Sequence, residues 1–370
     1  MTDIFDYLYW RGDLSTEQIP MNAVDGMVLA RMSYLPFEYA APLSAGKSVT
    51  VAEAAKALLS LNDLDEKIRQ KSDIPLLEAL TENHRFGDIA VSDCTSTIDT
   101  ETQTQFAAST FHMADCSVCV SFRGTDNTLV GWKEDFNMSF VCPVPGQARA
   151  VEYLERIAAR YTGELTVVGH SKGGNLAVYA AAFCRVETQN RIRAVFNYDG
   201  PGFDDKVLQT DGYRAICNKV GTFVPQSSVV GMLLGHEEKY TIIHSEQLGI
   251  MQHDIFSWEV GRDGFACLTA VDNSSRFINY TLKAWIAEMD YKQRETFIDA
   301  IYAVLTETHA GTLDELSENW FENARTVIKS LKSLDEPTRK ALSQAITLLA
   351  KSAKEGLAQL WESDKQEQNN

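Results

Sequence analysis

The spacing of apolar residues divides the chain into three stretches. Over residues 1–83 apolar positions recur every three or four residues, and Thr50-Val51-Ala52-Glu53 has the form of a capping box that opens a helix. Residues 84–274 alternate between short β-rich runs and helical stretches, and residues 275–370 return to helical stripes. The pattern predicts an N-terminal helical segment packed on a core, the α/β core itself and a C-terminal helical region.

The middle stretch carries the strands. Its β-rich runs, separated by polar and turn-forming residues, predict strands at residues 86–92, 104–111, 117–122, 164–168, 192–198 and 240–244. Helical spacing predicts helices at residues 147–161 and 175–185. Strands and helices that alternate along a chain form βαβ units, so we expect a mostly parallel sheet with helices on its faces.

Composition and charge restrict the partners of the chain. Of its 370 residues, 45% are apolar and 23% are charged, which is ordinary for a globular protein. The net charge of −17 disfavours nucleic acid and anionic membrane surfaces as partners, because both require a basic surface. No apolar run approaches the ~18 residues of a transmembrane segment. The acidic residues 1–7 lack the features of a signal peptide, so we expect a cytoplasmic protein.

The cysteines indicate reduced thiols. There are seven of them, an odd number spread along a long chain, so a disulfide framework is not expected. Cys116 and Cys119 form a C-x-x-C pair within a run that we predict to be a strand. Residues three apart on a strand point to opposite faces, so the two sulfurs would not converge on a metal. We expect structural thiols, and no metal or organic cofactor is implied.

The segment Gly169-His170-Ser171-Lys172-Gly173 fits the pattern G-x-S-x-G of a nucleophile elbow. A predicted strand runs directly into it and an Ala-rich predicted helix runs out of it, which is the context that this motif requires. The turn is so tight that the residues around the serine must be nearly free of side chains. We therefore predict that Ser171 is a nucleophile at a helix N-terminus; the alternative is a glycine-rich turn with an idle serine.

This elbow, extended by Gly174, resembles the Gly-His-Ser-Leu-Gly-Gly elbow of the class 3 (fungal type) lipases. The run Val120-Ser-Phe-Arg-Gly-Thr-Asp126, followed by Gly131-Trp132 and Asp135-Phe136, is similar to a second motif of the same lipases. More closely, the chain resembles a bacterial family of lipase-like proteins with this elbow. The class 3 likeness covers residues 84–260, and the closer likeness includes residues 25–38. The resemblance implies an α/β-hydrolase fold and serine chemistry, but no substrate.

A serine nucleophile requires a base, and in this fold the histidine comes last in the chain. Four histidines follow Ser171 at a distance, namely His236, His244, His253 and His309. His253 follows the predicted strand at 240–244 by a short connection and corresponds in position to the histidine of class 3 lipases, so it is our predicted base. His236 and His244 are more simply explained as structural imidazoles, and His309 lies in the helical tail.

The acid of the triad is less directly indicated. Class 3 lipases carry Asp-Ile-Val-Pro, but the corresponding segment here begins with Thr222. Asp199 follows the predicted strand at 192–198, which resembles the alternative acid position of pancreatic-type lipases. We predict that Asp199 is the acid. An aspartate before Gly200-Pro201 is also explained by turn chemistry alone.

The predicted oxyanion hole combines the backbone N–H groups of Lys172 and Thr125. Thr125 corresponds to the class 3 Ser/Thr whose hydroxyl assists, and Lys172 stands where those lipases carry Leu, so its charge faces either solvent or a partner. Together these residues predict a serine esterase or lipase-like hydrolase that cleaves a carboxylic ester, lipid esters included, through an acyl-enzyme. The alternatives are a catalytically idle hydrolase fold used for binding or scaffolding, and a peptidase or acyltransferase on the same triad.

Overall fold

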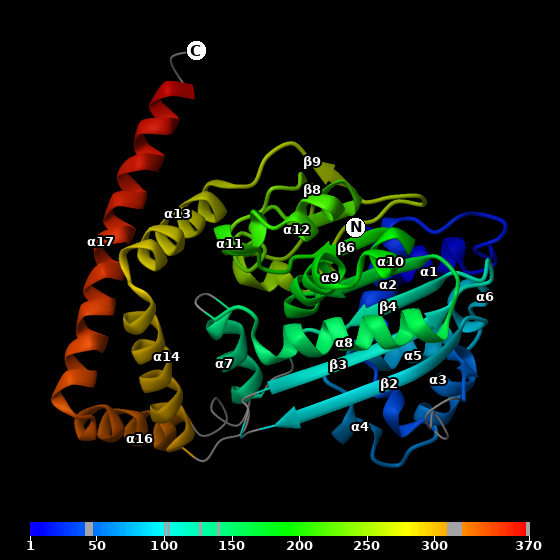
Figure 1. Cartoon of the computed structure of the whole chain (residues 1–370), viewed down its shortest axis with the longest axis horizontal. Coiled ribbons are helices and arrows are strands. Elements are labelled where there is room, and N and C mark those ends of the chain that lie inside the picture. Colours follow the sequence, from blue (N-terminus) through cyan, green and yellow to red (C-terminus); the bar gives the residue numbers. More distant parts are fainter. Residues whose placement is uncertain are drawn as a thin grey trace. The chain divides into compact units, whose positions relative to one another are not determined.

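Within the residues that the computed structural model describes, namely 1–40, 47–99, 101, 104–125, 128–138, 141–308 and 320–367, nine strands form one sheet in the order of the sequence (Figure 1). The strands are β1 (Val49–Thr50), β2 (Ala90–Asp99), β3 (Thr104–His112), β4 (Val118–Phe122), β5 (Leu165–His170), β6 (Ile192–Tyr198), β7 (Val220–Pro225), β8 (Tyr240–Ile243) and β9 (Cys267–Leu268). Strands β4 to β8 are parallel, whereas β3 is antiparallel to β4 and β9 to β8. The carboxyl ends of the parallel strands therefore meet at one edge of the sheet.

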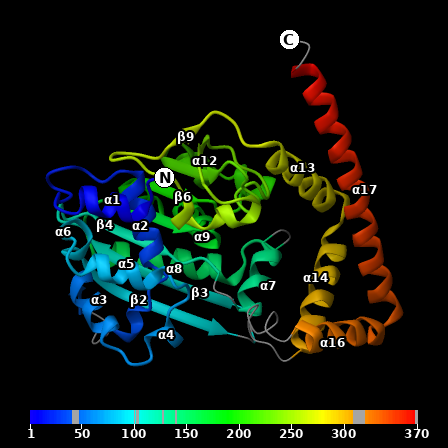
Figure 2. The same ribbon diagram turned by 180° about the vertical axis from the view of Figure 1, so that it is seen from behind.

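Helices cover both faces of this sheet. A Cβ added at Gly26 in α2 (Ala23–Met32) would meet the side chains of Phe196 and Tyr198, whereas one added at Gly174 in α9 (Lys172–Phe183) would meet Asn197. Because successive residues of a strand point to opposite faces, α2 and α9 lie on opposite sides of β6. Figures 1 and 2 show the same division, with the N-terminal helices in blue on one side and α9 in green on the other.

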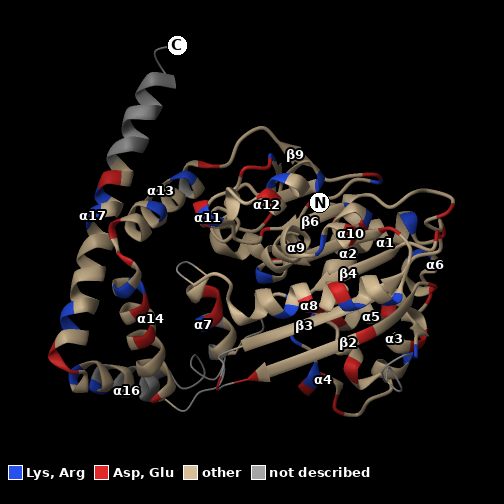
Figure 3. Ribbon diagram, in the orientation of Figure 1, with Lys and Arg blue, Asp and Glu red and all other residues tan. Residues whose placement is uncertain are grey.

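The other helices of this part of the chain lie either before strand β2 or after strand β4 in the sequence. Before β2 come α1 (Ile4–Arg11), α3 (Val51–Leu59), α4 (Leu64–Lys67), α5 (Asp73–Leu80) and α6 (His84–Gly87). After β4 come α8 (Pro145–Arg160), α10 (Val186–Arg191), α11 (Asp205–Leu208) and α12 (Asp211–Ile216). The central strands β3, β4 and β5 carry no Lys, Arg, Asp or Glu (Figure 3), which suits strands covered on both faces. A mixed sheet, parallel from β4 to β8, between two layers of helices is the α/β-hydrolase fold that the sequence predicted, although less of the sheet is parallel than expected.

Two predicted elements differ from the structure. The predicted strand at residues 86–92 is wrong at its start, because Asn83 caps the short helix α6 by accepting a hydrogen bond from the N–H of Phe86, and β2 begins only at Ala90. The strand β7 was not predicted; it contains Gly221 and ends in Pro225, both of which weaken a strand pattern. Cys116, with φ +63°, lies in a turn before β4, and Cys119 is buried within that strand.

The chain divides into two compact units. The first comprises residues 1–97, 106–124 and 146–271, and its N-terminal helices share one buried apolar core with the sheet. The second comprises residues 98–105, 125–145 and 272–370, and it holds α7 (Leu129–Asn137), α13 (Asn273–Glu288), α14 (Tyr291–Thr306), α16 (Trp320–Ser333) and α17 (Glu336–Glu367). Packing of the C-terminal helices on the core stays a prediction. None of the helices in the described ranges is both long and apolar enough to span a bilayer.

The second unit has an aromatic contact and a polar contact that join its helices. The ring of Trp285 in α13 packs edge-on against Phe297 in α14, with the ring centroids 5.2 Å apart. The indole Nε1 of Trp285 donates to the carbonyl oxygen of Ala345 in α17 at 2.8 Å. Lys133 in α7 forms an ion pair with Asp299 in α14 at 2.9 Å. Residues 125–138 are thereby joined to the C-terminal helices by side-chain contacts.

A buried ion pair connects the N-terminal helices of the first unit. The side chains of Asp25 and Arg85 are fully buried, and two guanidinium nitrogens donate to the two carboxylate oxygens at 2.6 Å each. Tyr7 donates its hydroxyl to the same carboxylate at 2.9 Å. Burial, and then the charge of Asp25, raise the pKa of Tyr7 far above its ordinary value, so the hydroxyl remains a donor. The pair thus fixes three helices at one buried point.

We expect Asp25→Asn to lower the free energy of unfolding by about 3–5 kcal/mol, because it leaves a buried guanidinium without its counter-charge. Urea denaturation followed by circular dichroism measures this change. The matched control is Lys67→Met, which breaks a surface ion pair with Asp63 and should leave the unfolding midpoint unchanged. Equal midpoints for the two variants would contradict the role of the buried pair.

Candidate active site

Ser171 lies at the sharp turn between β5 and α9. Its backbone has φ +59° and ψ −135°, which is a strained conformation for a residue with a side chain. A Cβ at Gly173 would come within 2.1 Å of the carbonyl oxygen of Phe122, so the turn is packed tightly against the end of β4. The helix that begins at Lys172 directs the positive end of its dipole toward the serine. This is the geometry of the predicted nucleophile elbow.

Asp199 leaves the sheet beside Ser171. In the register of the parallel strands β5 and β6, His170 is opposite Tyr198, and the N–H of Ser171 donates to the carbonyl oxygen of Tyr198 at 2.9 Å. Asp199 is fully buried and has a φ of +51°. One carboxylate oxygen accepts from the hydroxyl of Ser228 at 2.5 Å and from the N–H of Gly231 at 3.1 Å. The loop after β7 thus holds this carboxylate in place.

His253 binds the other carboxylate oxygen of Asp199. The distance from His253 Nδ1 to Asp199 Oδ2 is 2.6 Å. His253 ends the 3₁₀ turn Gly249–His253, and a quarter of its side chain is exposed. With the proton of the neutral ring on Nδ1, Nε2 carries the lone pair that can accept a proton. The structure brings together the predicted base and the predicted acid.

The other candidate histidines have different partners. His236 Nδ1 lies 2.9 Å from Glu238 Oε1, and Thr222, at the place of the class 3 acid, donates to the same oxygen at 2.6 Å. Burial would raise the pKa of Glu238, but the hydrogen bond and charge of His236, helped by hydroxyl groups, lower it to about 2. His244 pairs with Glu259 at 2.7 Å. Each of these two histidines thus pairs its Nδ1 with a carboxylate other than Asp199, whereas the buried Nε2 of His236 has no hydrogen-bond partner among the described residues. His309 lies outside the described residues.

The two predicted oxyanion donors, Lys172 and Thr125, have different surroundings. Lys172 follows Ser171 directly, and its side chain is only 1% exposed, so its charge does not face solvent. Thr125 follows Gly124, whose backbone lies so close to the elbow that an added Cβ would be 2.9 Å from the Cβ of Ser171. The hydroxyl of Thr125 donates to Asp135 at 2.5 Å, so these two residues of the lipase-like motif contact each other.

Two residues at the site were not recognised from the sequence. His170 Nε2 contacts the carbonyl oxygen of His253 at 2.8 Å, and its Nδ1 lies 3.2 Å from the hydroxyl of Tyr34. The motif gives His170 no role of its own beside the serine, and Tyr34 belongs to no catalytic motif. The only signal for Tyr34 in the sequence was its place within residues 25–38. The resemblance to the lipase-like family includes these residues, although they precede the α/β core.

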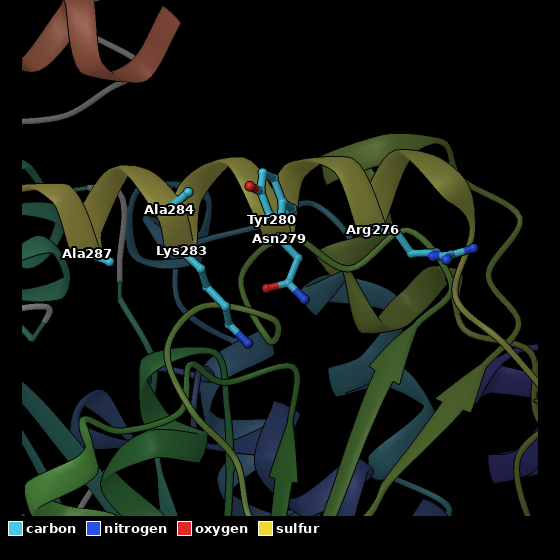
Figure 4. A pocket seen from close by; sticks show the side chains of 6 residues that line it. All are labelled: Arg276, Asn279, Tyr280, Lys283, Ala284 and Ala287. Atoms are coloured by element: carbon cyan, nitrogen blue, oxygen red, sulfur yellow. The ribbon is translucent and has the colours of Figure 1, made fainter. Parts of the chain in front are cut away.

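A concave region along α13 has no comparable chemistry. Figure 4 shows the side chains that line it, which are Arg276, Asn279, Tyr280, Lys283, Ala284 and Ala287. Burial lowers the pKa of Lys283, but no histidine, cysteine or carboxylate lines this region. The paired base and acid at the elbow therefore remain the candidate active site.

Comparison with known proteins gives one family and several structures. A family model described as Mbeg1-like matches residues 80–303. No curated protein sequence matches the chain. A mutant form of MDLA from Penicillium cyclopium is 18% identical with a TM-score of 0.38, covering 67% of this chain and 86% of that one. The lipase–propeptide complex of Rhizomucor miehei is 14% identical with a TM-score of 0.37, covering 59% of this chain and 67% of that one. At this identity neither structure says what the chain acts on.

We expect Gly173→Ala to destabilise the first unit by about 1–3 kcal/mol, because the new Cβ would meet a main-chain oxygen that cannot turn aside. Thermal denaturation would show this as a lower Tm. Gly264→Ala is the matched control, since a Cβ there has no atom within 4 Å and the backbone is unstrained. A Tm for Gly173→Ala equal to that of the control would mean that the turn is not tightly packed.

Proposed function

The chain belongs to the Mbeg1-like family, and we propose that it is a serine hydrolase that cleaves a carboxylic ester through an acyl-enzyme. The observation that carries the proposal is the hydrogen bond of 2.6 Å between His253 Nδ1 and the buried Asp199, beside a serine in a strained turn. A serine nucleophile, a histidine base and a carboxylate that orients the base are the groups that acyl transfer by serine requires.

The first half of the reaction forms the acyl-enzyme. The Ser171 hydroxyl oxygen attacks the carbonyl carbon of the ester while His253 Nε2 takes its proton, and Asp199 stabilises the resulting imidazolium. The N–H groups of Lys172 and Thr125 stabilise the negative oxygen of the tetrahedral intermediate, assisted by the dipole of α9. Collapse of the intermediate breaks the bond to the leaving oxygen, which receives the proton from His253 and departs as an alcohol.

The second half releases the acid. Water attacks the acyl carbon of the ester on Ser171 while His253 again takes a proton. When the second tetrahedral intermediate collapses, the proton passes to the Ser171 oxygen, and the carboxylic acid leaves. The net reaction adds one water across the ester bond, and it returns every protein group to its starting state.

An exposed apolar stretch before the base supports an ester with an apolar acyl group, lipid esters included. Leu248, Ile250 and Met251 are 84%, 58% and 62% exposed, and the last of them lies two residues before His253. Consecutive large apolar side chains in water are unfavourable unless they serve to contact another apolar surface. These three side chains lie on the same loop as His253, the proposed base.

The competing functions differ in what they require of the triad. An idle hydrolase fold was suggested by Thr222 in place of the class 3 acid, but the buried carboxylate of Asp199, held by Ser228 and Gly231, supports an intact triad. A peptidase or an acyltransferase would use the same three residues. A peptidase differs from an esterase in its leaving group, and an acyltransferase differs in the acceptor of the acyl group. All seven cysteines are free thiols, which supports the proposal of a reducing compartment such as the cytoplasm.

We expect Ser171→Ala to lower ester hydrolysis by on the order of 10³-fold or more without changing the fold. The assay is a panel of p-nitrophenyl esters of increasing chain length, together with labelling by a fluorophosphonate probe. Ser109→Ala, at a buried serine of β3, is the matched control and should retain both activity and labelling. A folded Ser171→Ala protein with full activity would end the serine-hydrolase proposal, and failure of the native protein to label would favour the idle fold.

We expect His253→Ala to be nearly as damaging as Ser171→Ala, because the members of a triad act as a unit. Asp199→Asn should lower kcat by up to ~10⁴-fold, since the amide favours the wrong tautomer of His253. His236→Ala and His244→Ala serve as controls that should keep most of the activity. An inactive His236→Ala beside an active His253→Ala would assign the base to the pair of His236 and Glu238.

A further inference from the structure

His170, the residue before the proposed nucleophile, is buried with both ring nitrogens engaged. Its Nε2 lies 2.8 Å from the main-chain oxygen of His253, and its Nδ1 lies 3.2 Å from the hydroxyl of Tyr34. The rings of His170 and His253 are also packed together, with centroids 4.6 Å apart. The elbow thus contacts the backbone of the proposed base through the side chain of the residue that precedes Ser171.

The partners determine which nitrogen of His170 carries the proton. A carbonyl oxygen only accepts hydrogen bonds, so Nε2 must be the donor to His253. Burial, and then the nearby His253, lower the pKa of His170 well below its ordinary value, so the ring is neutral. In the neutral ring Nδ1 is then an acceptor, and the Tyr34 hydroxyl donates to His170, whose acceptors within reach are Nδ1 and the main-chain oxygen at 3.3 Å.

Tyr34 also connects the elbow to the end of β4. The N–H of Gly124, the residue before Thr125, donates to the hydroxyl oxygen of Tyr34 at 3.0 Å. A side chain at Gly124 would occupy this space, because an added Cβ would be 2.3 Å from that hydroxyl oxygen. The Tyr34 hydroxyl therefore accepts a hydrogen bond from the N–H of Gly124, which precedes the proposed oxyanion donor, and donates a hydrogen bond to His170.

The N-terminal helical segment supplies Tyr34 and further contacts to the loop of the base. The guanidinium of Arg31 lies over the ring of Tyr34 at 4.7 Å and over the ring of Phe256 at 4.9 Å. Gln70 donates its amide to Asp254, the neighbour of His253, at 2.7 Å. These contacts hold the loop of the base from the side of α2, whereas Asp199 holds it from the sheet.

We infer that Tyr34 and His170 form a positioning relay, supplied in part by the N-terminal helical segment, that holds the proposed base and the end of β4 in register with Ser171. The inference rests on the proposed function and adds two positioning residues to it. Neither residue exchanges a proton with the substrate; His170 holds the backbone of the proposed base, and Tyr34 holds the strand end that leads to the proposed oxyanion donor. Displacement of reacting groups by about 1 Å is enough to lower a rate by up to 10²-fold.

The test compares Tyr34→Phe, His170→Phe and His170→Gln with the native protein. Tyr34→Phe and His170→Phe remove the hydrogen bonds but keep an aromatic ring, and we expect kcat to fall by about 10-fold to 10²-fold with KM nearly unchanged. His170→Gln keeps an amide donor near the position of Nε2 and should recover most of the kcat lost in His170→Phe. If Tyr34 and His170 were only structural, the variants would lower the Tm without a separate fall in kcat, and His170→Gln would not recover kcat relative to His170→Phe.

Tyr153→Phe is the matched control, since Tyr153 is a buried tyrosine whose hydroxyl binds Thr110 and the carbonyl oxygen of Asp93, away from the elbow. It should lower the Tm as much as Tyr34→Phe and leave kcat native. Native kcat in folded Tyr34→Phe and His170→Phe would overturn the relay, as would equal kcat in His170→Phe and His170→Gln. If Ser171→Ala were fully active, the proposed function itself would fall, so the two failures are distinct.

Discussion

The register between β5 and β6 is the constraint on which the site depends. Because the strands are parallel and His170 is opposite Tyr198, the next residue of each strand, Ser171 and Asp199, leaves the sheet at the same edge. Both have a positive φ, which costs energy for residues with side chains, and the surrounding packing holds both in that conformation. The backbone bond from Ser171 to Tyr198 connects the two turns directly. Everything else at the site is arranged around these two strand ends.

The proposed acid follows one strand, and the loop after the neighbouring strand holds it. Thr222 stands where the class 3 pattern has an aspartate, and it binds the buried Glu238. The loop that follows the same strand instead supplies Ser228 and Gly231 to the carboxylate of Asp199. A fully buried carboxylate requires such donors, because an ion without them would be strongly destabilised. The loop after β7 therefore holds the carboxylate of the proposed acid, which follows β6.

The N-terminal helices belong to the same folding unit as the sheet. Their apolar residues share its core, and the buried pair of Asp25 and Arg85 fixes α2 where it packs on β4, β5 and β6. Tyr34 follows α2 by two residues, so its position depends on that packing. A segment that looks from its sequence like an accessory to the core thereby contacts the elbow, the end of β4 and, through Arg31 and Gln70, the loop of His253.

What the sequence by itself determined was local: the strand, the glycine-rich elbow and the following helix lie within some twenty consecutive residues, where spacing and turn chemistry are sufficient. Strands β3 to β6 and β8 and the helices α8 and α9 were predicted for the same reason, whereas the short helices α10, α11 and α12 were not. The misplaced strand at residues 86–92 and the unpredicted β7 are cases where a cap, a glycine or a proline disturbed the pattern. The tertiary structure decided which histidine meets which carboxylate, since His253 and Asp199 are 54 residues apart and His236 has an acid of its own. It also revealed Tyr34, because a hydrogen bond between residues 136 positions apart leaves no periodic signal in either segment.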